Sequence, residues 1–184
     1  MEIIIISGKS SSGKDTFAEM MRQKLEKVGC KCLTCHYADL VKHYAGIYYG
    51  WTGVKDEPGR QLLQELGTDK VRSKFPDYWA EAIGKFLAAV PDDFDCAFVP
   101  DARFENEIEV VKRYNPQAKI IRIERYNEDG TLYLNPKLTQ DQHNHPSETS
   151  LDDYEDWDYI VENHNLEELE ESAEAILADL QLLV

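Results

Sequence analysis

Residues 8–16 read Gly-Lys-Ser-Ser-Ser-Gly-Lys-Asp-Thr and directly follow the apolar run Ile3-Ile4-Ile5-Ile6. Two glycines five positions apart let the backbone curl so that consecutive N–H groups point at phosphate oxygens. Lys14 can reach the β- and γ-phosphates of a nucleotide, and a helix that begins there adds its positive N-terminal end. The segment therefore predicts a phosphate-binding loop between a buried strand and a helix.

The context of this loop favours phosphate binding over the alternative, a plain Gly/Ser-rich turn. Apolar residues continue at helical spacing after it and stop at a glycine, as this kind of loop requires. Asp15 stands where Ser or Thr normally binds Mg²⁺, and Thr16 comes one position later. The residues that the loop predicts to bind ATP are Gly8, Lys9, Ser11, Ser12, Gly13, Lys14, Asp15 and Thr16.

Short apolar runs alternate with helical patterns along the chain, which predicts an α/β fold. We expect a five-stranded parallel sheet with helices on both faces, in a single domain covering 1–184. Expected strands are 2–7, 32–37, 95–100, 118–124 and 157–161. The stretch at about 125–156 carries turn signals but no long element, and a connection of this length is more often a mobile lid than a simple connector. Its alternative interpretation is disorder in solution.

Ligands bind such sheets at the carboxyl ends of the strands. The polar residues expected there, besides the loop, are Asp39, Asp101, Arg103, Arg125 and Asn163. Asp101 can hold Mg²⁺ or orient an acceptor phosphate, and Arg103 can bind phosphate oxygens through its forked guanidinium. The alternative is a helix cap followed by a surface arginine.

A basic run lies in the helical region at about 50–90 and comprises Lys55, Arg60, Lys70, Arg72 and Lys74. Arg60 and Arg72 could line an acceptor site, or could belong to a solvated helix face. Arg122 alternates with two isoleucines, so we expect it to face outward from its strand. Arg125 is better placed to close over a phosphate.

The net charge of −15 is unevenly distributed. Residues 138–184 contain 14 acids and no Lys or Arg, whereas residues 1–137 hold 21 acids and 20 bases. This balance argues against binding long nucleic acid, which needs a basic stripe, but permits a small phosphorylated substrate. No apolar stretch is long enough to span a membrane, and Met1 opens directly into a strand pattern, so we expect a cytoplasmic protein. The oligomeric state stays open, with a homodimer among the options.

These residues taken together resemble the bacteriophage-type deoxynucleoside monophosphate kinases, within the P-loop nucleotide and metabolite kinases. The resembling segments run in order along the chain: Ser7-Gly8-Lys9, Ser12-Gly13-Lys14-Asp15-Thr16, Arg60-Gln61-Leu62-Leu63-Gln64, Gly67-Thr68-Asp69 with Arg72, Pro100-Asp101-Ala102-Arg103-Phe104-Glu105-Asn106-Glu107, and Pro146-Ser147-Glu148 with Leu151-Asp152.

The resemblance implies a P-loop kinase fold and phosphoryl transfer from ATP, with Mg²⁺, to a deoxynucleoside monophosphate. It implies that Lys14 stabilises charge on the transferred group and that Asp101 organises Mg²⁺ or the acceptor. Candidate Mg²⁺ ligands are Asp15, Thr16 and Asp101. Helices at about 50–90 would bind the acceptor, and Asn163 would belong to the adenine-side loop. The arginines implied to position the acceptor phosphate or to neutralise the transition state are Arg60, Arg72, Arg103 and Arg125.

Two other interpretations compete with this one. Animal-type phosphomevalonate kinases resemble the same loop ending and the acidic segment around Leu151-Asp152, but they have a second Arg where this chain has Phe104. A P-loop module that binds nucleotide as a non-catalytic switch is the third interpretation. The chain lacks the Asn-Lys-x-Asp pattern that reads guanine in such switches, which disfavours it.

Overall fold

The computed structural model describes residues 1–54 and 56–183. In these ranges five strands form one parallel sheet in the order β2-β3-β1-β4-β5. The strands are β1 (Glu2–Ser7), β2 (Cys32–Thr34), β3 (Cys96–Ala102), β4 (Lys119–Arg125) and β5 (Tyr159–Asn163). No helix within the described ranges combines the length and apolarity needed to cross a membrane.

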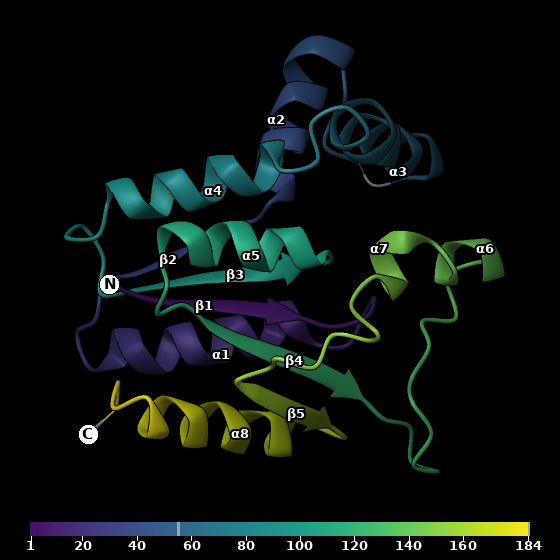
Figure 1. Cartoon of the computed structure of the whole chain (residues 1–184). Helices are drawn as coiled ribbons and strands as arrows, with labels where there is room; N and C mark the ends of the chain where they lie inside the picture. Colours follow the sequence, from purple (N-terminus) through teal and green to yellow (C-terminus); the bar gives the residue numbers. More distant parts are fainter. Residues whose placement is uncertain (55, 184) are drawn as a thin grey trace.

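The central strand β1 is buried on both faces, which explains why residues Ile3 to Ile6 are all apolar. Ile4 and Ile6 pack with side chains of α1 (Lys14–Lys27) and α8 (Leu166–Asp179). Ile3 and Ile5 pack with side chains of α4 (Tyr78–Ala89) and α5 (Glu105–Tyr114). Figure 1 shows the two helix pairs on opposite faces of the sheet. The alternation that sequence predicted therefore builds a three-layer fold.

A smaller helical unit stands above one end of the sheet, in the region where acceptor-binding helices were expected (Figure 1). It contains α2 (Ala38–Tyr49), α3 (Glu57–Gln64) and the π-helix η1 (Glu65–Arg72), and it has its own core of Val41, Ala45, Leu66 and Trp79. Apolar residues at positions 62, 63, 66 and 71 have the spacing of a helix over 60–73. The helix instead begins at Glu57, where Asp56 accepts a hydrogen bond from the N–H of Gly59, and widens into π-turns after Gln64.

The expected lid-like stretch contains two single-turn helices, α6 (Gln140–His143) and α7 (Pro146–Thr149). An antiparallel bridge between Tyr126 and Leu132 stiffens its beginning. Figure 1 shows α6 and α7 beyond the carboxyl ends of the strands. The stretch is therefore ordered by local helix caps, and α7 lies next to the phosphate-binding loop.

Candidate active site

The phosphate-binding loop joins β1 to α1 and depends on its two glycines. Gly8 has a φ of 153° and Gly13 a φ of 104°, values that residues with a side chain rarely adopt. A Cβ on Gly8 would lie 2.4 Å from the carbonyl oxygen of Ile123, and one on Gly13 would lie 2.6 Å from Nδ2 of Asn163. The spacing that identified the loop is thus required both by backbone conformation and by close packing.

Asn163, on the edge strand β5, holds the phosphate-binding loop in place. It is the last residue of β5, not a residue beyond that strand as sequence suggested, and its side chain is buried. Its Nδ2 donates a hydrogen bond of 2.8 Å to the carbonyl oxygen of Ser12. Asn163 therefore positions the loop backbone, while a direct contact with adenine stays a prediction.

Lys14 is 6% exposed, and its Nζ donates to the carbonyl oxygen of Lys9 at 2.8 Å. Burial lowers the pKa of Lys14 to about 7, and the positive charge of Arg103 acts in the same direction. The carboxylates of Glu148, Asp15 and Asp101 act in the opposite direction. An anionic phosphate bound in the loop would favour the charged ammonium, because it supplies the negative partner that burial demands.

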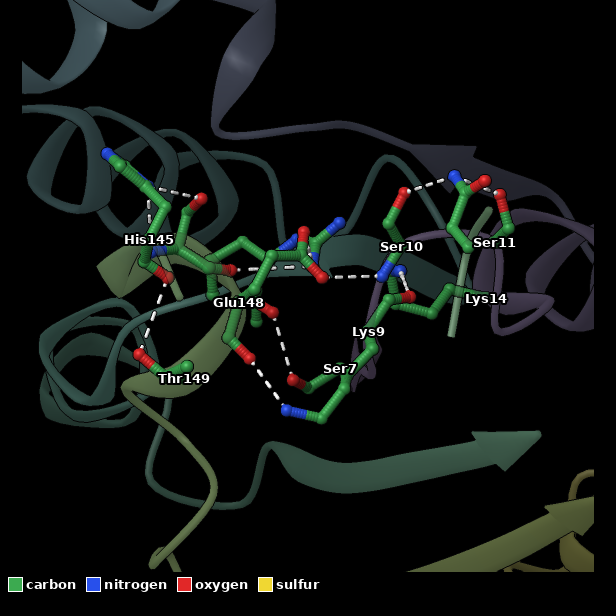
Figure 2. Close-up of polar contacts among 12 residues, drawn as sticks. Ser7, Lys9, Ser10, Ser11, Lys14, His145, Glu148 and Thr149 are labelled. Carbon is green, nitrogen blue, oxygen red and sulfur yellow. Dashed lines mark hydrogen bonds and ion pairs between the residues drawn. The ribbon is translucent and has the colours of Figure 1, made fainter. Parts of the chain in front are cut away.

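A carboxylate from α7 lies on the loop. Glu148 accepts a hydrogen bond from the N–H of Ser10 at 2.7 Å and another from Nη1 of Arg103 at 2.8 Å. Figure 2 shows Glu148 reaching toward Ser10 of the loop. Lys9 contacts the same segment, through the carbonyl oxygen of Glu148 at 3.0 Å and both carboxylate oxygens of Asp152 at 2.7 Å. An anion is therefore held between the loop and Arg103.

Arg122 does not face outward, so that expectation was wrong. Its side chain is 8% exposed, donating to the carbonyl oxygen of Leu151 at 2.9 Å and to the carboxylate of Asp152 at 3.3 Å. The segment after α7 covers this face of β4, which strand alternation alone could not reveal. Arg125 is exposed at the end of β4 and donates to the carbonyl oxygen of Ser11 at 3.2 Å. It therefore lies beside the loop, as expected.

A cavity of about 170 Å³ lies between the helical unit and the end of β3. Its lining includes Leu63, Arg72, Trp79, Asp101 and Arg103. The structure thus brings together two of the predicted acceptor arginines and the predicted aspartate. Arg60 is exposed on α3 and does not line this cavity, so its role stays a prediction, and Lys55 of the basic run lies outside the described residues.

Asp101 lies inside β3, because the strand continues past Pro100 to Ala102. Its carboxylate accepts hydrogen bonds from the N–H groups of Tyr37 at 2.9 Å and Ala38 at 3.1 Å. Burial raises the pKa of Asp101, although the nearby charge of His36 and these two N–H groups act against that rise. Asp101 thus anchors the start of α2 at the cavity wall.

The predicted Mg²⁺ ligands were Asp15, Thr16 and Asp101. Asp15 and Thr16 are exposed at the start of α1, with Oδ1 of Asp15 lying 3.6 Å from Nε2 of His36. Among the described residues, no group of three His, Cys, Asp or Glu side chains could hold a metal ion. Mg²⁺ usually takes one or two protein carboxylates and completes its shell with phosphate oxygens and water. The oxygen donors present fit that mode of binding, and their assignment stays a prediction.

Glu107 is a residue of this site that the sequence reasoning did not single out. It is 2% exposed and accepts hydrogen bonds from the N–H groups of Arg103 and Phe104 and from the guanidinium of Arg72. A glutamate at the third position of a helix is a known capping signal, and it could have been noticed here.

This topology and this loop define the class of the protein, the P-loop kinases. APS kinase of Mycobacterium tuberculosis in complex with AMPPNP and APS is 12% identical, with a TM-score of 0.56 over 98% of this chain and 97% of that chain. A gluconokinase from Sinorhizobium meliloti is 19% identical, with a TM-score of 0.54 over 97% and 93%. Shikimate kinase from Bacteroides thetaiotaomicron is 13% identical, with a TM-score of 0.52 over 98% of both chains. At these identities the likeness confirms the predicted fold.

Comparison of the sequence with models of protein families identifies the family of this chain. The profile of the deoxynucleotide monophosphate kinase family matches residues 58–173, and the chain belongs to this family. The resemblance drawn from the motifs is thereby confirmed, and the protein is a kinase. No curated protein sequence matches the chain.

Proposed function

We propose that the protein transfers the γ-phosphoryl group of ATP to a deoxynucleoside monophosphate, giving ADP and the diphosphate. The observation that carries this proposal is that the cavity beside the phosphate-binding loop has both charged and apolar side chains in its lining. Arg72 and Arg103 line it together with the apolar side chains of Val41, Leu63 and Trp79. A nucleoside monophosphate likewise combines a charged phosphate at one end with a flat base, which has apolar faces, at the other.

In this proposal the reaction needs positioning and charge rather than a general base, because the acceptor phosphate is already a nucleophile. The loop and Lys14 hold the donor phosphates, with Arg125 closing beside Ser11. Arg72 binds the acceptor phosphate, and Arg103 neutralises charge on the transferred group between donor and acceptor. Asp101, Asp15 and Thr16 would hold Mg²⁺, which neutralises phosphate charge when bound.

The cavity also indicates that binding requires movement. Its volume of about 170 Å³ is smaller than the roughly 300 Å³ at which pockets for small molecules begin. The walls contributed by α2, α3 and η1 belong to the helical unit, which has its own small core. We expect this unit to shift outward when the acceptor enters.

The carboxylate of Glu148 lies where the outer phosphate of the donor is expected, so ATP must displace it. Glu148→Gln keeps the shape of the side chain but loses its charge, and charged hydrogen bonds are about twice as strong as neutral ones. We expect the Kd for ATP, measured by calorimetry, to fall by roughly 3- to 10-fold, since a charged hydrogen bond contributes about 1 kcal/mol more than a neutral one.

The matched control for this change is Glu155→Gln, an exposed acid in the segment that follows α7. It should leave the Kd for ATP unchanged. Weaker ATP binding in Glu148→Gln would contradict the displacement argument and would indicate that Glu148 assists the bound nucleotide.

The proposed function is tested by coupled ADP release with ATP and Mg²⁺. The acceptor panel contains deoxynucleoside monophosphates, their ribose counterparts and mevalonate phosphate. We expect turnover with at least one deoxynucleoside monophosphate. Turnover with the mevalonate ester alone would replace the proposed acceptor, whereas tight ATP binding without turnover of any acceptor would favour the nucleotide-dependent switch.

A further inference from the structure

The two arginines that line the proposed acceptor cavity come from different parts of the fold. Arg72 is the last residue of η1 in the helical unit, and Arg103 follows β3 of the main sheet. Their separation must nevertheless be set closely, because reacting phosphates must be aligned before transfer. Glu107, in the first turn of α5, contacts both residues.

The two carboxylate oxygens of Glu107 have different partners. Oε2 accepts from the backbone N–H of Arg103 at 2.7 Å and of Phe104 at 3.1 Å, which caps α5. Oε1 accepts from Nη2 of Arg72, forming an ion pair between side chains that are 3% and 14% exposed. One buried carboxylate therefore connects the end of β3 to the end of η1.

Other contacts fix the Arg72 guanidinium in the same place. Its Nη1 donates to Oδ1 of Asn106 at 3.1 Å, and its Cζ lies 3.9 Å from the centre of the Phe104 ring. Asn106 in turn donates to the carbonyl oxygen of Pro76 at 2.9 Å, which ties the connection between η1 and α4 to α5. The guanidinium is thereby oriented from one side, while Arg72 still lines the cavity on the other.

The negative charge at this point is costly, and the helix cap does not require it. Burial raises the pKa of Glu107 to about 7, and the charge of Asp101 adds to the rise, whereas Arg72 and the N–H of Arg103 oppose it. A glutamine oxygen could accept the same two backbone N–H groups at a lower desolvation cost. The contact that needs a full charge is the one with Arg72.

We propose that Glu107 is a positioning residue, whose ionised carboxylate holds Arg72 at a fixed distance from Arg103 so that both can bind the acceptor phosphate. This inference rests on the proposed function. Glu107 does not touch the substrate itself, and it acts through the orientation of Arg72.

The test is Glu107→Gln, with Glu105→Gln as the control because Glu105 is an exposed acid in the same helical turn. We expect Glu107→Gln to raise the KM for the monophosphate by about 10-fold, equivalent to one charged hydrogen bond, while the KM for ATP stays within about 2-fold. If Glu107 had a merely structural role, the change would instead weaken the binding of both substrates together. Equal KM values for the monophosphate in wild type and Glu107→Gln would overturn the proposal.

The dependence of the monophosphate KM on pH gives a second measurement, which a purely structural role of Glu107 would not change. Arg72 from η1, Asp101 from β3, Arg103 from the loop after it and Tyr37 at the start of α2 face Glu107. Because the pKa of Glu107 is raised to about 7, its charge is present above that pH and is lost below it. The monophosphate KM of the wild type should therefore rise as the pH falls below 7, more steeply than in Glu107→Gln.

Two further measurements separate the possible failures. If Glu107→Gln does not fold, the wild-type pH profile is compared with that of Arg72→Gln, which should lack the extra rise; identical profiles would overturn the proposal. Wild-type turnover is measured first. Its absence with every monophosphate would overturn the proposed function and this inference with it, whereas normal wild-type turnover with an unaffected variant would overturn this inference alone.

Discussion

Lys14→Ala is expected to lower kcat by roughly 100- to 1,000-fold, the range found when one preorganised donor to a developing charge is removed. Lys14 is the buried cation of the loop, and its Nζ lies 2.8 Å from the carbonyl oxygen of Lys9. In the absence of nucleotide its charge is poorly solvated, as its lowered pKa indicates. The charge that develops on the transferred phosphoryl group would interact with this cation most strongly in the transition state, so the effect of Lys14 should appear in turnover.

Stability provides the second measurement for this variant. Alanine removes a buried ammonium group, so the midpoint of thermal unfolding should stay the same or rise. The control is Lys27→Ala, an exposed lysine at the end of the same helix, which should keep full turnover. An unchanged rate in a folded Lys14→Ala protein would remove the loop lysine from the mechanism.

Arg103→Ala is expected to reduce kcat by about 1,000-fold, the lower end of the range for arginines that stabilise a transferring phosphoryl group. Its guanidinium and the N–H of Ser10 both contact the carboxylate of Glu148, which marks a point between the donor loop and the acceptor cavity. Alanine keeps the backbone N–H that donates to Glu107, so the cap of α5 survives the change. The loss should therefore be catalytic rather than structural.

ATP affinity distinguishes the role of Arg103 from a donor role. Calorimetry should show only a modest change in the Kd for ATP, while the rate of a single turnover falls. Arg113→Ala is the control, because that arginine makes an exposed ion pair with Glu81, of a kind that contributes little. If Arg103→Ala weakened ATP binding and left turnover of bound ATP intact, the donor and acceptor roles would have to be exchanged.

Sequence predicted the parts of the site that depend on local pattern. The phosphate-binding loop is local, since its glycines and Lys14 lie within one turn between a strand and a helix. The sheet was also predictable, because β1 and β3 contain apolar runs of the kind that parallel sheets bury. Asp101 and Arg103 were found from a general rule about the carboxyl ends of strands.

The remaining features depend on contacts between distant segments. Arg122 alternates with isoleucines and looked solvent-facing, yet residues 151–157 fold back and bury it. Glu148 reaches the loop across 138 positions of sequence. Arg60 and Arg72 looked equivalent, but only Arg72, the last residue of η1, lines the cavity. Apolar spacing does not reveal a π-helix, because the same residues fit an α-helix almost as well.

The π-helix has a consequence for which changes of chain length the protein can tolerate. Successive side chains of an α-helix point in directions about 100° apart. If one residue were removed from Glu65–Arg72 and the turns became α-helical, the side chains that follow would therefore rotate about the helix axis. Arg72 would then point away from Glu107, although its neighbours in sequence were untouched. Homologues should therefore rarely differ in length within Glu65–Arg72, and a one-residue gap inside η1 would mark a protein with a different acceptor.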